Sequence, residues 1–213
     1  MNKKIITSII YCTDNILDKS LETKVIKLLR ENSNDLPIIS VSRKPIKLGT
    51  NICVGEKVPV CESSKMKMLL KGLRQATTEN VVVAFPDCLY PPEYFSFNPK
   101  QKDTLYQYEN VWTLGDKYWK KKFLEGAQGA NRKYWMEILK EALTGQTGWD
   151  IVDIKHPISN KIDYLSWTSG NPVVRLITDK GTQKFSNIDR KKSPQKQLPY
   201  WGSVSELKTK MGL

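Results

Sequence analysis

An unbroken apolar run that ends at a single acidic residue constrains the fold more than any other feature of this sequence. Residues 81–85 (VVVAF) are β-branched or apolar without alternation, the pattern of a strand covered on both faces. Asp87 follows, and two prolines then end the strand region. Because open α/β sheets bind ligands beyond the carboxyl ends of their strands, Asp87 is a candidate site residue. A turn before the prolines explains it equally well.

The segments around this run alternate between strand and helix patterns, which is typical of a parallel sheet flanked by helices. The Pro/Gly-rich stretch 44–60 is expected to form a loop. The expected elements are strands over 5–12, 36–42, 81–85, 105–112, 164–167 and 173–178, and helices from Ser20 to about Asn32, from Ser63 or Ser64 to about Thr77, and over 131–143. We therefore expect an α/β protein.

A chain of 213 residues fits one domain, and its opening order of strand, helix and strand is typical of the first half of a nucleotide-binding α/β sheet. Basic residues broken by Ser and Pro over 186–197 predict a mobile surface loop. Trp201 and its neighbour Tyr200 are expected to pack back on the domain.

Composition excludes several classes of protein. No segment approaches the ~20 apolar residues of a membrane helix, and residues 1–12 read as a strand rather than a signal peptide. The four cysteines form no CxxC pair and lie far from the one histidine, so ordinary zinc spacing is missing and reduced, cytoplasmic thiols are expected.

The charge is strongly basic and uneven. Lys and Arg number 34 against 22 acidic residues, a net charge of +12. Residues 1–98 hold 14 basic and 10 acidic side chains and residues 99–213 hold 20 and 12, so the second half carries +8. This excess favours a polyanion such as nucleic acid as partner, although a basic surface that aids solubility accounts for it as well.

Several segments together resemble one family. They are YCTDN, ISVSRKPIKLGTNICVG, KGLRQATTENVVVAFPDCLYPP, YENVW, ANRKYW and LPYWG. In this order they are similar to small GT-A glycosyltransferases of phages and microbes, relatives of the enzymes that attach sugars to hydroxymethylated bases in DNA. The resemblance implies a GT-A (Rossmann-like) single domain with a central, mostly parallel sheet, and a nucleotide-sugar donor such as a UDP-sugar. It also implies a nucleotide-sugar-binding half, 1–98, and an acceptor-binding half, 99–213.

The resemblance also implies donor contacts at the end of the first strand. Thr13, Asp14 and Asn15 would lie near the nucleobase and ribose, where a carboxylate can accept hydrogen bonds from ribose hydroxyls. An Asx turn is the structural alternative for Asp14.

Two further groups of residues are candidates for donor binding. Gly49 and Asn51 would allow backbone N–H groups to approach the donor, but a structural loop explains them too. Lys65 or Lys71 could reach the diphosphate, although lysines on a helix surface usually face water.

Asp87 matches the last acid of the family's metal-binding motif, which implies a divalent ion, Mn²⁺ or Mg²⁺, bridging the donor phosphates. The sequence departs from the motif because Phe85 stands where an acid is expected. Asp179 follows Thr178 where a late histidine ligand is expected, and His156 does not match that position. A weakly held metal, a metal-free mechanism using Lys or Arg, and lost catalysis remain open; we favour retained activity.

An inverting transfer needs a carboxylate to accept the proton of the acceptor hydroxyl. Glu109, Asp116 and Glu125 lie downstream of the donor segments, and no local feature selects among them. A retaining transfer needs no such base.

Aromatic and basic residues mingle between 112 and 135, which suits sugar stacking or binding of an extruded base beside phosphates. Trp135 lies on the apolar helix face and is expected in the core. The candidate nucleic-acid contacts are Lys120, Lys121, Lys122, Arg132, Lys133, Arg190, Lys191 and Lys192.

The first interpretation is therefore an enzyme, a glycosyltransferase that moves a sugar to a hydroxymethylated or otherwise modified base in DNA. A transferase of the same fold acting on polysaccharide or lipid-linked sugar is the second. A non-catalytic, basic nucleic-acid-binding protein is the third.

Overall fold

The computed structural model describes residues 6–146, 148–149, 164–177 and 187–213. Thr178, Asp179 and His156 lie outside the described residues, as does Ser186 at the start of the predicted basic loop.

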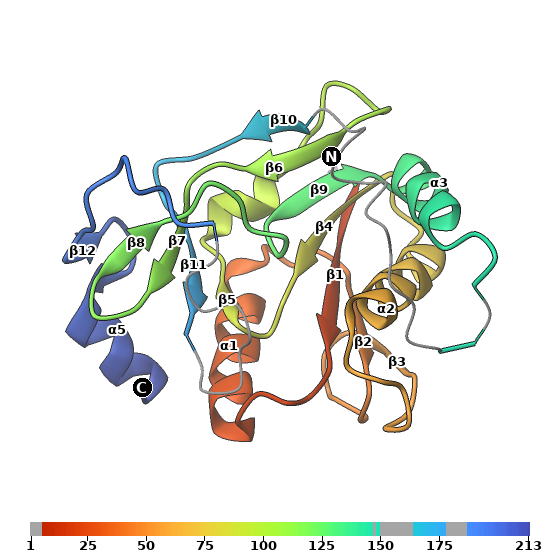
Figure 1. Cartoon of the computed structure of the whole chain (residues 1–213), viewed down its shortest axis with the longest axis horizontal. Helices are drawn as coiled ribbons and strands as arrows, with labels where there is room; N and C mark the ends of the chain where they lie inside the picture. Colours follow the sequence, from red (N-terminus) through yellow and green to blue (C-terminus); the bar gives the residue numbers. More distant parts are fainter. Residues whose placement is uncertain (1–5, 147, 150–163, 178–186) are drawn as a thin grey trace.

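A seven-stranded sheet forms the centre of the protein, with strand order β10-β6-β9-β4-β1-β2-β3 (Figure 1). β1, β2, β3 and β4 are parallel neighbours in the order β4-β1-β2-β3, β9 runs antiparallel between β4 and β6, and β10 is parallel to β6. The strands are β1 (Thr7–Thr13), β2 (Ile38–Ser42), β3 (Thr50–Cys53), β4 (Asn80–Ala84), β6 (Leu105–Tyr108), β9 (Gln128–Asn131) and β10 (Tyr164–Trp167).

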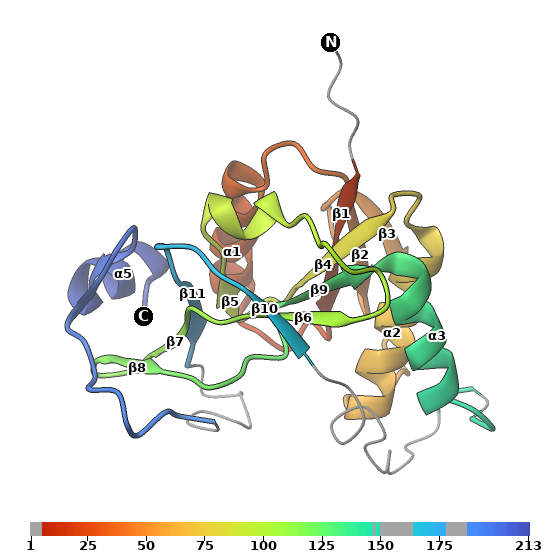
Figure 2. The same ribbon diagram turned by 90° about the horizontal axis from the view of Figure 1, so that it is seen from above.

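Helices and a short 3₁₀ turn cover this sheet. α2 and α3 lie side by side over one face (Figures 1 and 2), where α3 contacts both α2 and β9. The covering elements are α1 (Lys19–Asn32), α2 (Glu62–Gln75), the 3₁₀ turn η1 (Pro92–Ser96) and α3 (Arg132–Ala142). Asp18 caps α1 by accepting from the Ser20 and Leu21 amides, so the helix starts just before the predicted Ser20.

Both faces of the two central strands are buried. Val82 and Ala84 of β4 pack into one hydrophobic cluster, while Val81 and Val83 pack into the cluster under α2 and α3. Trp135, 3% exposed, lies in the second cluster as predicted. The non-alternating apolar run thus reflects a strand that has core on either side.

A smaller four-stranded sheet, in the order β5-β11-β7-β8, lies beside the large one (Figure 1). A final hairpin and helix pack against it through a cluster that contains Trp201, 5% exposed, whose indole N–H donates to the carbonyl of Pro172 at 2.6 Å. This confirms that the last residues fold back. The elements are β5 (Cys88–Leu89), β7 (Val111–Leu114), β8 (Tyr118–Lys120), β11 (Val173–Leu176), β12 (Gln197–Leu198), β13 (Gly202–Ser203) and α5 (Val204–Met211).

The predicted strand over 105–112 is two strands in two sheets. β6 belongs to the large sheet and β7 to the small one, and the chain turns between them at Glu109 and Asn110. The predicted loop over 44–60 contains edge strand β3, whose four residues include none that is buried, so its sequence pattern is weak. The overall expectation of a mostly parallel α/β sheet flanked by helices is confirmed.

Gly49 is required by the backbone rather than by a ligand. Its φ is +56°, and a Cβ built there would lie 1.9 Å from the carbonyl oxygen of Ile38. An L-residue is strained at this φ and would force β2 and the following turn apart.

We predict that Gly49→Ala lowers the free energy of unfolding by about 2–4 kcal/mol, because it adds both backbone strain and a clash. Gly170→Ala is the control, since a Cβ there meets nothing within 4 Å. Urea denaturation of both variants checks this, and a Gly49→Ala protein as stable as the control would contradict it.

Candidate functional site

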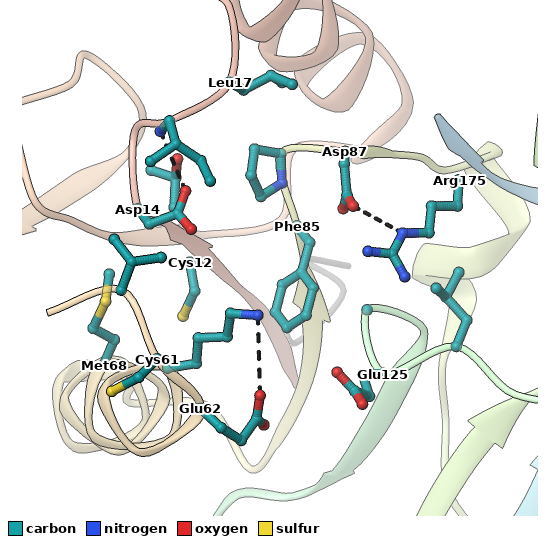
Figure 3. A pocket seen from close by; sticks show the side chains of 17 residues that line it. Cys12, Asp14, Leu17, Cys61, Glu62, Met68, Phe85, Asp87, Glu125 and Arg175 are labelled. Atoms are coloured by element: carbon teal, nitrogen blue, oxygen red, sulfur yellow. Dashed lines mark hydrogen bonds and ion pairs between the residues drawn. The ribbon is translucent and has the colours of Figure 1, made fainter. Parts of the chain in front are cut away.

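A cavity of about 310 Å³ opens at the carboxyl ends of β1 and β4 (Figure 3). The residues after these two strands meet the first turn of α2 there, because parallel strands end at the same sheet edge. Its lining comprises Cys12, Thr13, Asp14, Ile16, Leu17, Val60, Cys61, Glu62, Lys65, Met68, Phe85, Pro86, Asp87, Leu124, Glu125, Gly126 and Arg175. The sequence prediction of a site beyond Asp87 thus coincides with a cavity.

An ion pair joins the two sheets inside this cavity. The Arg175 side chain, from β11, donates from Nε to Oδ2 of Asp87 at 2.9 Å, and each side chain is 21% exposed. The Asp87 carbonyl also accepts from the Leu176 amide at 2.7 Å. Burial acts to lower the pKa of Arg175, but the neighbouring Asp87 carboxylate raises it above its ordinary value.

A lysine lies behind this pair. Lys121 is only 1% exposed, so it does not present the surface cation that the sequence analysis expected there. Burial and the nearby Arg175 lower its pKa to about 8, against the opposing attraction of Asp87 and Glu125. At neutral pH Arg175, which lines the cavity, and Lys121, which lines a second and more open hollow, are both cations and interact with Asp87 and Glu125.

The structure separates the three candidate bases. Glu125 lies in the loop between β8 and β9 and lines the cavity, close to Arg175 (Figure 3). Glu109 lines a different, more open hollow, and Asp116 lies exposed in the β7–β8 hairpin, where it accepts from the indole N–H of Trp119 at 3.0 Å. Only Glu125 shares a cavity with Asp87.

The residues after β1 combine structural and cavity-lining roles. Thr13 donates to Glu22 at 2.6 Å, and Asp14 accepts from the Ile16 amide in an Asx turn, yet both line the cavity. Asn15 has φ +57° and accepts from the Lys44 amide at 2.8 Å, and it is not among the lining residues.

Of the remaining candidates for donor binding, one lines the cavity and the others do not. Lys65 lines the cavity and lies 4.0 Å from Glu62. Lys71 lies further along α2 and does not line the cavity. Its Nζ is 5.8 Å from the centroid of the Trp149 ring. Asn51 donates to two serine hydroxyls of β2, each at 2.9 Å, so like Gly49 it serves the strand edge.

The described residues do not make a preformed metal centre. Among them, no three His, Cys, Asp or Glu side chains lie close enough together to hold an ion. Asp87 already binds Arg175, and a divalent ion about 4 Å from that guanidinium would meet a repulsion of roughly 8 kcal/mol, taking about 4 per unit-charge pair at an effective dielectric constant near 20. Asp179, the other predicted ligand, lies outside the described residues.

Two basic segments that are distant in sequence lie side by side. The amide of Asp189 donates to the carbonyl of Lys120, and the Lys122 amide donates to Asn187, both at 2.8 Å. The exposed residues Lys122 and 190–192 therefore gather on one surface, which we call the basic ridge. The described part of the predicted mobile loop is tied to β8 by these bonds.

Other predicted nucleic-acid contacts lie elsewhere. Arg132 begins α3 at the opposite sheet edge, since Asn131 pairs with the first residue of β4, and its guanidinium donates to the carbonyl of Thr78 at 3.1 Å. Lys133 neighbours it there. Lys120 lies 5.6 Å from the ring centroid of Trp112, and burial lowers the pKa of Lys120 to about 8.

Sequence reasoning did not single out Arg175 as a site residue. The available signal was its position, because it is the one charged residue in the apolar strand VVRL. A charge in such a strand generally has a buried partner.

Several solved structures are similar to this chain at low sequence identity. The mannosyltransferase PcManGT from Pyrobaculum calidifontis, in complex with GDP-Man and Mn²⁺, is 16% identical with a TM-score of 0.50, covering 84% of this chain and 59% of that one. The inositol-1-phosphate CTP transferase from T. maritima is 8% identical with a TM-score of 0.51, covering 98% and 97%. A glycosyltransferase involved in glycosylation of the PBCV-1 major capsid is 10% identical with a TM-score of 0.48, covering 79% and 91%.

No protein-family model matches the sequence, and no curated protein matches it. No helix in the described parts of the chain has the length and apolarity to cross a bilayer. The fold likeness, together with the sheet order, confirms the predicted GT-A glycosyltransferase fold.

The pKa of Lys121 predicts a pH effect on stability. Between about 8 and its ordinary value of 10.5 the unfolded chain binds more protons at this residue than the folded one, so its contribution to stability rises with pH. As the pH increases across this range, we expect the free energy of unfolding of the parent to rise relative to that of Lys121→Met. Lys120 and the buried thiols titrate in both proteins, so their contributions cancel in the comparison. Free energies of unfolding that change with pH in parallel, measured by urea denaturation, would contradict this prediction.

Proposed function

We propose that this protein is a glycosyltransferase that uses a nucleoside diphosphate sugar. The observation that carries the proposal is the cavity at the carboxyl ends of β1 and β4, which combines carboxylates, a guanidinium and an apolar rim on a fold shared with a GDP-mannose-binding mannosyltransferase. In open α/β sheets this edge is where nucleotides bind.

The two sides of the cavity suit the two parts of such a donor. Ile16 and Val60, 37% and 47% exposed, form an apolar rim with Leu17, against which a nucleobase can pack. Asp14 beside them can accept from ribose hydroxyls. Arg175 on the far wall suits the diphosphate.

Glu125 is in position to act as general base in an inverting transfer. The acceptor oxygen would bond to the anomeric carbon while the bond from that carbon to the β-phosphate oxygen breaks, and the nucleoside diphosphate would leave with the electron pair. The acceptor proton would pass to the Glu125 carboxylate. In a retaining transfer Glu125 would not be needed as a base.

Nucleotidyl transfer is the competing chemistry on this fold, since a CTP-using enzyme shares it. Triphosphates are commonly held by glycine-rich loops whose backbone N–H groups approach the phosphates. The segment 13–18 between β1 and α1 (TDNILD) has no glycine, so it fits a triphosphate less well than a nucleotide sugar.

We predict that Glu125→Gln lowers transfer or donor hydrolysis by about 10²- to 10⁴-fold, the usual contribution of a general base. Nucleoside diphosphate affinity should change little. Glu109→Gln and Asp116→Asn are matched comparisons and should have much smaller effects. Release of UDP or GDP from a panel of nucleotide sugars measures this, and pyrophosphate release from CTP instead would favour nucleotidyl transfer.

For the acceptor, the proposal is a hydroxymethylated or otherwise modified base in DNA. The basic ridge and the net charge of +12 support a polyanionic partner. Polysaccharide or lipid-linked sugar is the alternative acceptor, and mass spectrometry of nucleosides after incubation with hydroxymethylated and plain DNA separates the possibilities.

We predict that the triple variant Lys122→Ala, Arg190→Ala, Lys191→Ala binds duplex DNA more weakly and with a salt dependence whose slope is smaller by about two to three. Arg132→Ala, at the opposite sheet edge, is the comparison. Equal salt slopes for the triple variant and the parent, measured by fluorescence anisotropy, would exclude the ridge as the DNA contact.

A further inference from the structure

The position of Arg175 gives this cavity an unusual cationic wall. It is the only charged residue of β11, and its side chain reaches across to the end of β4, where Asp87 holds its Nε. The neighbouring backbone supports the same arrangement, because β11 pairs with β5 so that Arg175 lies opposite Cys88, the residue after Asp87. The guanidinium is therefore fixed by both backbone register and ion pair.

Part of this guanidinium faces the cavity. Arginine has five N–H donors, and Asp87 accepts from Nε alone. Within the described residues its two terminal nitrogens make no hydrogen bond, and they face the side of the cavity that holds Phe85 and Glu125 (Figure 3). A planar fork of donors in this position matches the geometry of phosphate oxygens.

A second cation lies near this wall without lining the cavity. Lys121 is 1% exposed and interacts electrostatically with Arg175, Asp87 and Glu125. The partly exposed Arg175 and the buried Lys121 repel each other, and a dianion bound at Arg175 would relieve part of that repulsion.

Among the residues that the structure describes, the wall also lacks the group of ligands that a metal would need. Phe85 places an aromatic ring beside Asp87, where a second carboxylate would be required. Asp87 itself is engaged by Arg175 at 2.9 Å.

We propose that Arg175, oriented by Asp87 and backed by Lys121, binds the diphosphate of the donor and takes the charge-neutralising part that a divalent ion would otherwise have. This inference rests on the proposed function. When the bond from the anomeric carbon to the β-phosphate oxygen breaks, the electron pair stays on that oxygen, and the terminal N–H groups of Arg175 stabilise the added charge. Asp87 is then a positioning residue and not a metal ligand.

The first experiment is isothermal titration of the full chain with UDP and with GDP, in excess EDTA and in MnCl₂. We expect one of the two to bind in EDTA with an affinity within about threefold of that in Mn²⁺. Binding only with Mn²⁺ would overturn the role of Arg175 and leave the proposed function intact. No binding under either condition would overturn the proposed function itself.

The second experiment compares variants in EDTA. Arg175→Ala should weaken nucleoside diphosphate binding by about 10- to 100-fold, the usual effect of losing charge-assisted hydrogen bonds, and Arg175→Lys should restore part of it. Arg74→Ala removes an exposed arginine in the last turn of α2, away from the cavity, and should bind like the parent. Circular dichroism and thermal melting establish that each variant is folded.

A double-mutant cycle separates orientation from metal binding. If Asp87 acts through Arg175, Asp87→Asn should weaken binding in the parent by about tenfold and have little further effect in the Arg175→Ala background. Independent, additive effects of the two substitutions would contradict the proposal. So would an Asp87→Asn effect that appears only when Mn²⁺ is present.

Discussion

The ion pair between Asp87 and Arg175 is the interaction on which the site depends, because it links the two sheets at the point where the cavity forms. Asp87 follows β4 of the large sheet, and Arg175 lies in β11 of the small one. The Leu176 amide donates to the Asp87 carbonyl as well, so backbone and side chain hold the same junction. The position of the cavity wall relative to the strand ends is therefore fixed by the small sheet.

Such a pair is a poor choice for stability alone. Desolvating two charges costs much of what their attraction returns, and well-packed apolar residues of similar size often stabilise a protein equally. Lys121 adds a third charge, itself buried, whose pKa is lowered to about 8 by burial and by Arg175. Such a concentration of charge is typical of functional sites.

The second half of the chain contributes more to the site than its sequence patterns indicate. Glu125 and Arg175 both come from this half, and both line the cavity beside Asp87. The basic ridge also belongs to it. Lys122 of the ridge is exposed, whereas the adjacent Lys121 is buried and interacts electrostatically with Asp87 and Arg175.

The sequence by itself determined the parallel core and the edge at which the site lies. The run over 81–85 had to be covered on both faces, and the apolar spacing of α2 and α3 supplied the cover of one face, since these patterns depend on local periodicity. Tertiary structure alone decided the second sheet, the inward direction of Lys121, and the choice of Glu125 among three carboxylates. Those features depend on pairings between distant, very short strands, whose residues have no periodic pattern to reveal their partners.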